Sequence, residues 1–200
     1  MPKPSTADRP RRRADAERSI ASIISAARDT LSTDSEASID DIAKAAGVGR
    51  MTVYGHFRNR SELVEAALIA ALRDGDQVLS GVDLSGDTRE ALARLLESSW
   101  SLVAQSSALL TAAQGVLPAG RVRELHSGPA DRVEYLIRRG RERGEFRTDL
   151  PTMWLVNAVH YILKGAAEES RAGRLSDDEV AAVINATVQS ILAIPADRDG

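Results

Sequence analysis

The stretch SIDDIAKAAGVGRMTVYGHF, residues 38–57, decides the fold of this chain. Its first half carries apolar residues at helical spacing, which predicts a short amphipathic helix. Ser38 precedes that helix and Asp41 follows three residues later, which is the pattern of a capping box. Gly47 can adopt the left-handed conformation that ends a helix. The stretch therefore predicts a helix, a tight turn and a second short helix, which is the helix-turn-helix pattern.

The outward positions of the second helix carry side chains that can hydrogen-bond to DNA, and none of them is acidic. A recognition helix places its N-terminal residues on base edges while neighbouring groups hold phosphates. We therefore expect Arg50, Met51 and Thr52 to read bases. The flanking cations Lys44 and Arg60 are expected phosphate contacts. The alternative is a plain helical hairpin with a solvated basic face.

The longer stretch IDDIAKAAGVGRMTVYGHFRNRSELVEAAL resembles the DNA-binding signature of the tetracycline-repressor (TetR) family. Three blocks carry the resemblance in order: I-A-x-x-A-G-V, T-V-Y-x-H-F and S-E-L. An apolar segment upstream, IASIISAARDTL, sits at the family's usual distance. The resemblance implies an all-helical, homodimeric transcriptional regulator with phosphate contacts at Tyr54 and His56, and we expect a further phosphate contact from Ser38.

Two positions depart from the family pattern. Gly49 stands where the family commonly has Ser, so the second helix loses a side-chain acceptor at its cap, although Gly is tolerated there. The loop STDSEAS lacks the Gly often found between the first two helices. Its turn must therefore be made by Asp34 or Ser35.

Composition excludes several classes of protein. The chain has no Cys, which excludes disulfides and thiol redox chemistry. It has no apolar run long enough to span a membrane. We see no signal peptide and expect a cytoplasmic protein. The net charge is −3, but residues 1–61 hold 11 Lys and Arg against 8 Asp and Glu, so the basic part coincides with the motif.

Three regions are expected along the chain. Residues 1–14, rich in Pro and Arg, predict a flexible basic arm that either makes an extra DNA contact or is a solvated terminus. Residues 15–62 form the DNA-binding domain, which a first helix from Asp15 to Leu31 completes. Residues 63–200 form a ligand-binding and dimerisation domain.

The whole chain is predicted to be all-α, with about nine helices. A helix capped by Asn59 is expected to fade near Gly75, and Asp87 begins the next. A separate short helix is expected over 108–116, with a brief turn at 121–125. The last three helices begin near Pro129, Pro151 and Ser176.

The last helix shows an apolar stripe too regular to remain in water. With its predecessor it is expected to form a four-helix bundle in a homodimer. The expected interface residues are Val180, Ile184, Thr187, Val188 and Ile191.

No enzyme constellation is found, and we expect no cofactor and no metal. The three histidines, His56, His126 and His160, lie in three different predicted segments. Polar and aromatic residues stand inside the apolar helices of the second half, where a ligand pocket of a helical bundle would place them. The candidate pocket residues are Trp100, Gln114, Tyr135, Trp154, Asn157 and Tyr161. The alternative for these residues is core packing or contact with a dimer partner.

The sequence therefore predicts a sequence-specific DNA-binding regulator. We expect a homodimeric repressor on double-stranded operator DNA whose binding a small molecule relieves. The alternatives are a helical DNA-binding protein without a ligand and, more distantly, a helical enzyme. Operator footprinting separates the first two, because only a regulator protects one short, near-palindromic site.

Overall fold

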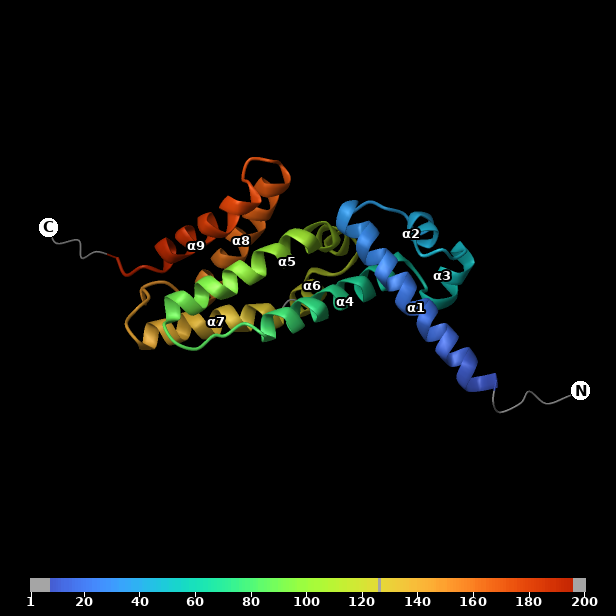
Figure 1. The fold of residues 1–200 in the computed structure, drawn as a ribbon, viewed down its shortest axis with the longest axis horizontal. Coiled ribbons are helices and arrows are strands. Elements are labelled where there is room, and N and C mark those ends of the chain that lie inside the picture. The colour runs from blue at the N-terminus through green and yellow to red at the C-terminus, as the bar shows by residue number, and fades with distance from the viewer. Residues whose placement is uncertain (1–7, 126, 196–200) are drawn as a thin grey trace, which may run out of the picture. The chain divides into compact units, whose positions relative to one another are not determined.

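The computed structural model describes residues 8–125 and 127–195, which form nine α-helices and no strand (Figure 1). The predicted all-α class is therefore confirmed. The helices, in chain order, are α1 (Asp8–Thr33), α2 (Ile39–Ala45), α3 (Arg50–His56), α4 (Arg60–Ser80), α5 (Thr88–Val116), α6 (Ala119–Leu125), α7 (Ser127–Glu142), α8 (Thr152–Arg171) and α9 (Asp177–Leu192).

The chain divides into two compact units. The first consists of the described residues up to Ala71 together with Ala108–Val122, and the second of Leu72–Ser107 and the described residues from Arg123 onward. The expected boundary between residues 62 and 63 falls inside α4 rather than at a linker. The functions assigned to the two domains stay predictions.

The first unit is built around a small core shared by its helices. α1 packs against α2, and α2 packs against α3. The apolar spacing read from the sequence points inward, because the residues at those positions are buried. They include Ile23, Ala27, Leu31, Ile42, Ala43, Val53, Phe57, Leu63 and Leu68.

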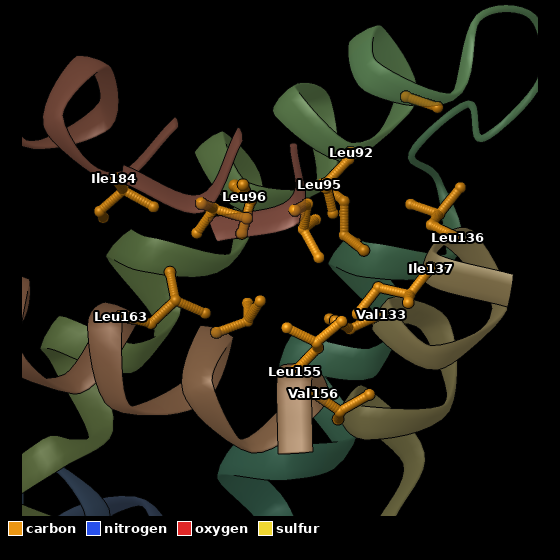
Figure 2. Close-up of a cluster of buried hydrophobic side chains, with 14 of the residues drawn as sticks. Leu92, Leu95, Leu96, Val133, Leu136, Ile137, Leu155, Val156, Leu163 and Ile184 are labelled. Carbon is orange, nitrogen blue, oxygen red and sulfur yellow. The ribbon is translucent and has the colours of Figure 1, made fainter. Parts of the chain in front are cut away.

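The second unit has a larger hydrophobic core, to which α5, α7, α8 and α9 all contribute (Figure 2). α7 packs against α8, and α8 packs against α9. Figure 2 shows Ile184 among these core side chains, together with Leu96 of α5 and Leu163 of α8. Burial of this apolar surface is the main favourable contribution to folding.

Two predicted helix starts are confirmed by hydrogen bonds, and backbone angles show how two further helices end. Asn59 caps α4, since its Oδ1 accepts from the backbone N–H of Glu62 at 2.9 Å. Asp87 caps α5 in the same way at 3.0 Å. Gly144 and Gly173, after α7 and α8, take the positive φ of 68° and 70° that favours glycine.

Two predicted breaks are wrong. α4 continues through Gly75 to Ser80, and α5 is one helix across residues 104–108 instead of two. A Cβ at Gly75 would lie 3.7 Å from Leu102, which is an ordinary van der Waals distance, so α4 lies beside α5 at this point. The hydroxyls of Ser106 and Ser107 donate to carbonyls of their own helix and so do not end it. The predicted turn at 121–125 belongs to α6.

The start of the first helix also differs from the prediction. α1 begins at Asp8, so residues 8–14 of the expected arm are helical. Pro10 is compatible with this because it lies in the first turn, where a backbone N–H has no helical partner. Residues 1–7 of the arm lie outside the described residues, and so does His126.

The loop between α4 and α5 is held by arginines through its main chain. Arg94 of α5 donates to two of its carbonyls, at 3.0 and 2.9 Å. Arg139 of α7 donates to a third, and Arg143 to a fourth at 2.9 Å. The four acceptors belong to Asp83, Leu84, Ser85 and Gly86.

Candidate DNA-binding surface

The start of α2 is fixed by a reciprocal cap. The backbone N–H of Asp41 donates to Ser38 Oγ at 3.2 Å, and the Ser38 backbone N–H donates to Asp41 Oδ2 at 2.9 Å. The Ser38 hydroxyl also donates to Asp41 at 2.6 Å. This hydrogen bond is the largest cause of the lowered pKa of Asp41. A phosphate contact by the exposed Ser38 hydroxyl would therefore compete with the cap.

The turn between α2 and α3 depends on Gly47. Its φ is 68°, and the next residue, Val48, donates its N–H to the carbonyl of Ala43 at 3.0 Å. A left-handed residue at this place satisfies free carbonyls at the end of α2. The turn brings the buried Ala43 and Val53 to the α2–α3 contact. α3 is thereby held with its opposite face in solvent.

The predicted base-reading residues gather on that open face. Arg50, Met51 and Thr52 are all exposed, and Met51 is 80% exposed. Gly49 caps α3 with extended backbone and without a side-chain hydrogen bond, as its residue type implies. The remaining predicted contacts divide by exposure: Ser38, Lys44 and Tyr54 are exposed, whereas His56 and Arg60 are half-buried.

Arg50 is held by residues from both helices of the motif. Its Nη1 donates to Asp40 Oδ2 at 2.9 Å, and its guanidinium lies over the Tyr54 ring, 5.4 Å from the centroid. Its Nη2 lies 3.5 Å from the Tyr54 hydroxyl. The hydrogen bond to Tyr54 and then the charge of Asp40 raise the pKa of Arg50, which therefore stays protonated.

Arg60, the predicted phosphate contact, bonds to the main chain of the first unit. Its guanidinium donates to the carbonyl of Ala37 and, at 3.0 Å, to the carbonyl of Ser35. These bonds fasten the α1–α2 loop, whose turn is closed by hydrogen bonds to Asp34, one of the two residues expected there. The side chain is therefore committed to the fold of the first unit. A structural role explains its partial burial.

A hollow of about 390 Å³ lies beside these residues. Its lining contains two carboxylates as well as two guanidinium groups. The residues that line it are Glu36, Ser38, Ile39, Asp40, Arg50, Tyr54 and Arg60. Sequence reasoning missed Asp40 and Glu36 here because both precede the recognition helix. The exposed position of Asp40 in the first turn of α2 was the one available signal.

Most of the residues assigned to the ligand pocket are exposed rather than enclosed. Trp154, Asn157 and Tyr161 are exposed on α8, with Trp154 at 61% and Tyr161 at 73%. They lie on the face opposite the buried residues of that helix, because positions three and seven apart share one side. Tyr135 on α7 is also exposed, and Arg139 lies over its ring at 5.7 Å from the centroid.

The other two predicted pocket residues, Gln114 and Trp100, have different surroundings. Gln114 is an exposed residue of the first unit, whereas the other five belong to the second. Trp100 packs against the hydrophobic core of the second unit, which is the alternative that the sequence left open. His160, one of the three histidines, donates Nδ1–H to the carbonyl of Val156 at 2.9 Å.

The predicted dimer interface is partly wrong. Val180, Ile184 and Val188 are fully buried in the core of their own chain, so they are not available to a partner. They face inward because α9 packs against α8 through them. Thr187 is exposed and Ile191 is half-buried, and these two stay candidates.

Within residues 8–125 and 127–195, no three His, Asp or Glu side chains gather as metal ligands would. Across the same residues, no helix combines the length and apolar character needed to cross a membrane.

Residues 23–67 match the family model described as bacterial regulatory proteins, tetR family. This segment contains the C-terminal part of α1, the cap at Ser38, α2, α3 and the start of α4. The first unit thus carries a TetR-type DNA-binding domain, and the resemblance of the sequence is confirmed. No curated protein matches the chain.

Solved structures extend the similarity to the whole fold. LfrR from Mycobacterium smegmatis, a TetR-like regulator in complex with proflavine, has a TM-score of 0.71 at 20% identity over 90% of this chain and 99% of that one. FadR from Bacillus halodurans, a fatty acid degradation regulator, has a TM-score of 0.70 at 22% identity over 90% of this chain and 97% of that one. FadR from Bacillus subtilis, in complex with stearoyl-CoA, has a TM-score of 0.70 at 17% identity over 88% of this chain and 99% of that one. The chain has the fold of TetR-family transcriptional regulators.

Proposed function

We propose that this protein is a homodimeric transcriptional repressor that binds operator DNA through α3 and is released by a small molecule. The observation that carries the proposal is the joint exposure of Arg50, Met51 and Thr52 in a domain that matches the TetR-family model. These residues begin α3, and the N-terminal end of a recognition helix is the part that meets base edges. A protein that acts on a bacterial chromosome works in the cytoplasm.

Dimerisation is supported by the exposed side of α8 and α9. Met153, Trp154 and Tyr161 of α8 are large and exposed, and Val183 of α9 is exposed as well. Large exposed apolar groups that lie together mark interaction surfaces. A second copy of the chain would cover them in a four-helix arrangement. Two copies also supply the two recognition helices that a near-palindromic operator requires.

The small-molecule effector is supported by what similar proteins bind. One structural relative is in complex with proflavine and another with stearoyl-CoA. An effector can weaken operator binding only to the extent that it binds the DNA-free conformation better. Typical coupling of about 1–3 kcal/mol would lower operator affinity roughly 5- to 150-fold. α4 contributes residues to both compact units, so a shift of this helix is the route we propose.

Selection from a random pool of double-stranded DNA tests the DNA-binding part. The expected result is enrichment of one near-palindromic sequence whose half-sites are centred about 34 Å apart, or a multiple of that distance. Footprinting should then show protection of both half-sites. Uniform protection without an enriched sequence would instead favour a non-specific helical DNA-binding protein.

The effector part is tested with two probes of different chemistry, proflavine and stearoyl-CoA. Because proflavine itself binds DNA, binding of each probe is measured first with the protein alone, by quenching of Trp100 and Trp154 fluorescence. A probe that binds is then added to the operator complex. Release of the operator supports a ligand-controlled repressor. Failure of both probes to bind favours the alternative, a DNA-binding protein without a ligand of these two types.

A further inference from the structure

The contact between Arg50 and Asp40 links the recognition helix to the helix before it. One guanidinium nitrogen of Arg50 bonds to Asp40 at 2.9 Å, and the Tyr54 ring lies beneath the guanidinium plane. The side chain is thus held from α2 on one side and from its own helix on the other. This arrangement fixes the direction of a group that the sequence already placed at the DNA.

Stability of the fold does not account for this ion pair. The side chains of Arg50 and Asp40 are 58% and 57% exposed. Pairs as exposed as this contribute little to folding, because water and salt screen them and two long side chains must be ordered. What the pair does supply is orientation. A guanidinium that is already ordered loses less conformational freedom when it binds DNA.

The contacts of Arg50 with Asp40 and Tyr54 leave hydrogen-bond donors of its guanidinium free for a base. A guanidinium carries five N–H donors in a planar fork, and Asp40 takes one of them through Nη1. Tyr54 approaches Nη2 only at the long distance of 3.5 Å. The planar fork therefore keeps a second edge, which can donate two parallel bonds to O6 and N7 of guanine. Fixing one edge on a carboxylate determines where the other edge points.

We infer that Asp40 is a positioning residue for DNA recognition: it holds Arg50 so that each half-site is read for guanine at one position. The inference rests on the proposed function, and it adds a residue outside the recognition helix to the determinants of specificity. Asp40 itself contacts no base. Its negative charge also repels phosphates, which lowers the affinity for all DNA sequences alike.

Glu36 provides the matched control. It lines the same hollow as Asp40, whereas the polar partners of Arg50 are Asp40 and Tyr54. Glu36→Gln and Asp40→Asn each remove one negative charge from the same part of the surface. Asp40→Ala removes the acceptor as well. Thermal unfolding of each variant checks that the fold is retained.

The measurement is base preference at each operator position, from selection out of a random DNA pool at fixed salt concentration. Arg50→Ala should lose the guanine preference at one position by roughly 5- to 150-fold, the range for a bidentate base contact. Asp40→Ala should reduce the guanine preference at that same position about tenfold. Asp40→Asn should reduce that preference by less. Glu36→Gln should leave the preference unchanged and raise affinity for all sequences alike. In an Arg50→Ala background, Asp40→Ala should have no further effect on preference.

Other outcomes would overturn the inference. If Asp40→Ala kept the full guanine preference while Arg50→Ala lost it, Asp40 would have no positioning role. Tighter operator binding by Asp40→Ala with an unchanged preference would make Asp40 a competitor of DNA instead. An unchanged preference in Arg50→Ala would equally remove the inference. If the wild-type protein enriched no sequence at all, the proposed function itself would fail, and the inference with it.

Discussion

Phe146 packs directly against Gly140, which leaves no room for a β carbon at position 140. A Cβ built there would overlap the phenyl ring, with Cγ only 2.8 Å away. Phe146 is buried in the core of the second unit, and Arg89 lies over its ring at 5.2 Å from the centroid. The chain reverses at Gly144 so that the backbone N–H of Phe146 reaches the carbonyl of Gly140 at 3.2 Å.

Gly140→Ala should therefore destabilise the protein. The added methyl group must displace a buried ring, and overpacking of this kind costs about 1–3 kcal/mol. Gly165→Ala is the control, because Gly165 lies within α8 and a Cβ there meets nothing within 4 Å. It should stabilise by about 0.5–1 kcal/mol. Urea unfolding measures both, and equal stability of the two variants would contradict the packing argument.

Arg60→Ala should lower the stability of the protein as well as its DNA affinity. The substitution removes the hydrogen bonds to the carbonyls of Ser35 and Ala37, which hold the α1–α2 loop. Hydrogen bonds from a charged group contribute about 1.5–3 kcal/mol. Arg58→Ala removes an exposed charge two positions earlier and serves as the control. If both variants unfolded at the wild-type urea concentration while DNA binding fell, the originally predicted phosphate contact would be the better account.

Tyr161→Glu should give a folded monomer, whereas Ile184→Glu should fail to fold. Tyr161 is exposed on the side of α8 that we assign to the partner, and Ile184 is buried in its own chain. A charge at the interface disfavours association, while an unpaired charge in the core disfavours folding itself. Sedimentation combined with circular dichroism separates the two effects. A Tyr161→Glu protein that remained dimeric would place the interface elsewhere.

Stability in acid should depend on the cap of α9. The backbone N–H and the hydroxyl of Ser176 both donate to Glu179, at 3.1 and 2.6 Å, and they lower the pKa of Glu179 from its ordinary value of 4.5. A carboxyl with a lower pKa in the folded state stabilises the protein above the unfolded pKa. That contribution is lost as pH falls through the folded value. Ser176→Ala raises the pKa of Glu179 toward 4.5, so the variant loses less stability when the pH is lowered.

The test compares the free energy of unfolding at neutral pH with that below pH 4.5. The decrease should be smaller in Ser176→Ala than in the wild type, although the variant is less stable at neutral pH because a cap is lost. An equal decrease in both proteins would show that Glu179 does not contribute to the acid dependence.

Features set by neighbours in the sequence were predicted well. The caps at Ser38, Asn59 and Ser176 follow from residues three apart, and the turn at Gly47 follows from its backbone freedom. The break expected at Gly75 was wrong, since α4 continues to Ser80 and lies beside Leu102 of α5 at this point. Helix α4 therefore continues where local propensity alone favours an end.

The candidate site shows the same division. Exposure of Arg50 and Met51 follows from helical periodicity within one short segment. The carbonyl partners of Arg60 lie more than 20 residues away, and no sequence pattern reports them. An apolar stripe such as that of Val180 and Ile184 shows that a helix must be covered, and it cannot distinguish its own core from a partner chain. For that reason Val180, Ile184 and Val188 were assigned to the dimer interface, although they lie in the core of their own chain.

The arginine bonds to residues 83–86 have a consequence for how this segment can vary. Surface connections generally accept insertions, because lengthening a loop costs little entropy. Here the acceptors are main-chain carbonyls of four successive residues, so the identities of the side chains are free to change. One inserted residue, however, would move carbonyls out of reach of their guanidinium groups and would leave Nη1 of the half-buried Arg139 without its acceptor. Relatives of this protein that keep these arginines should differ in the residue types of this connection and agree in its length.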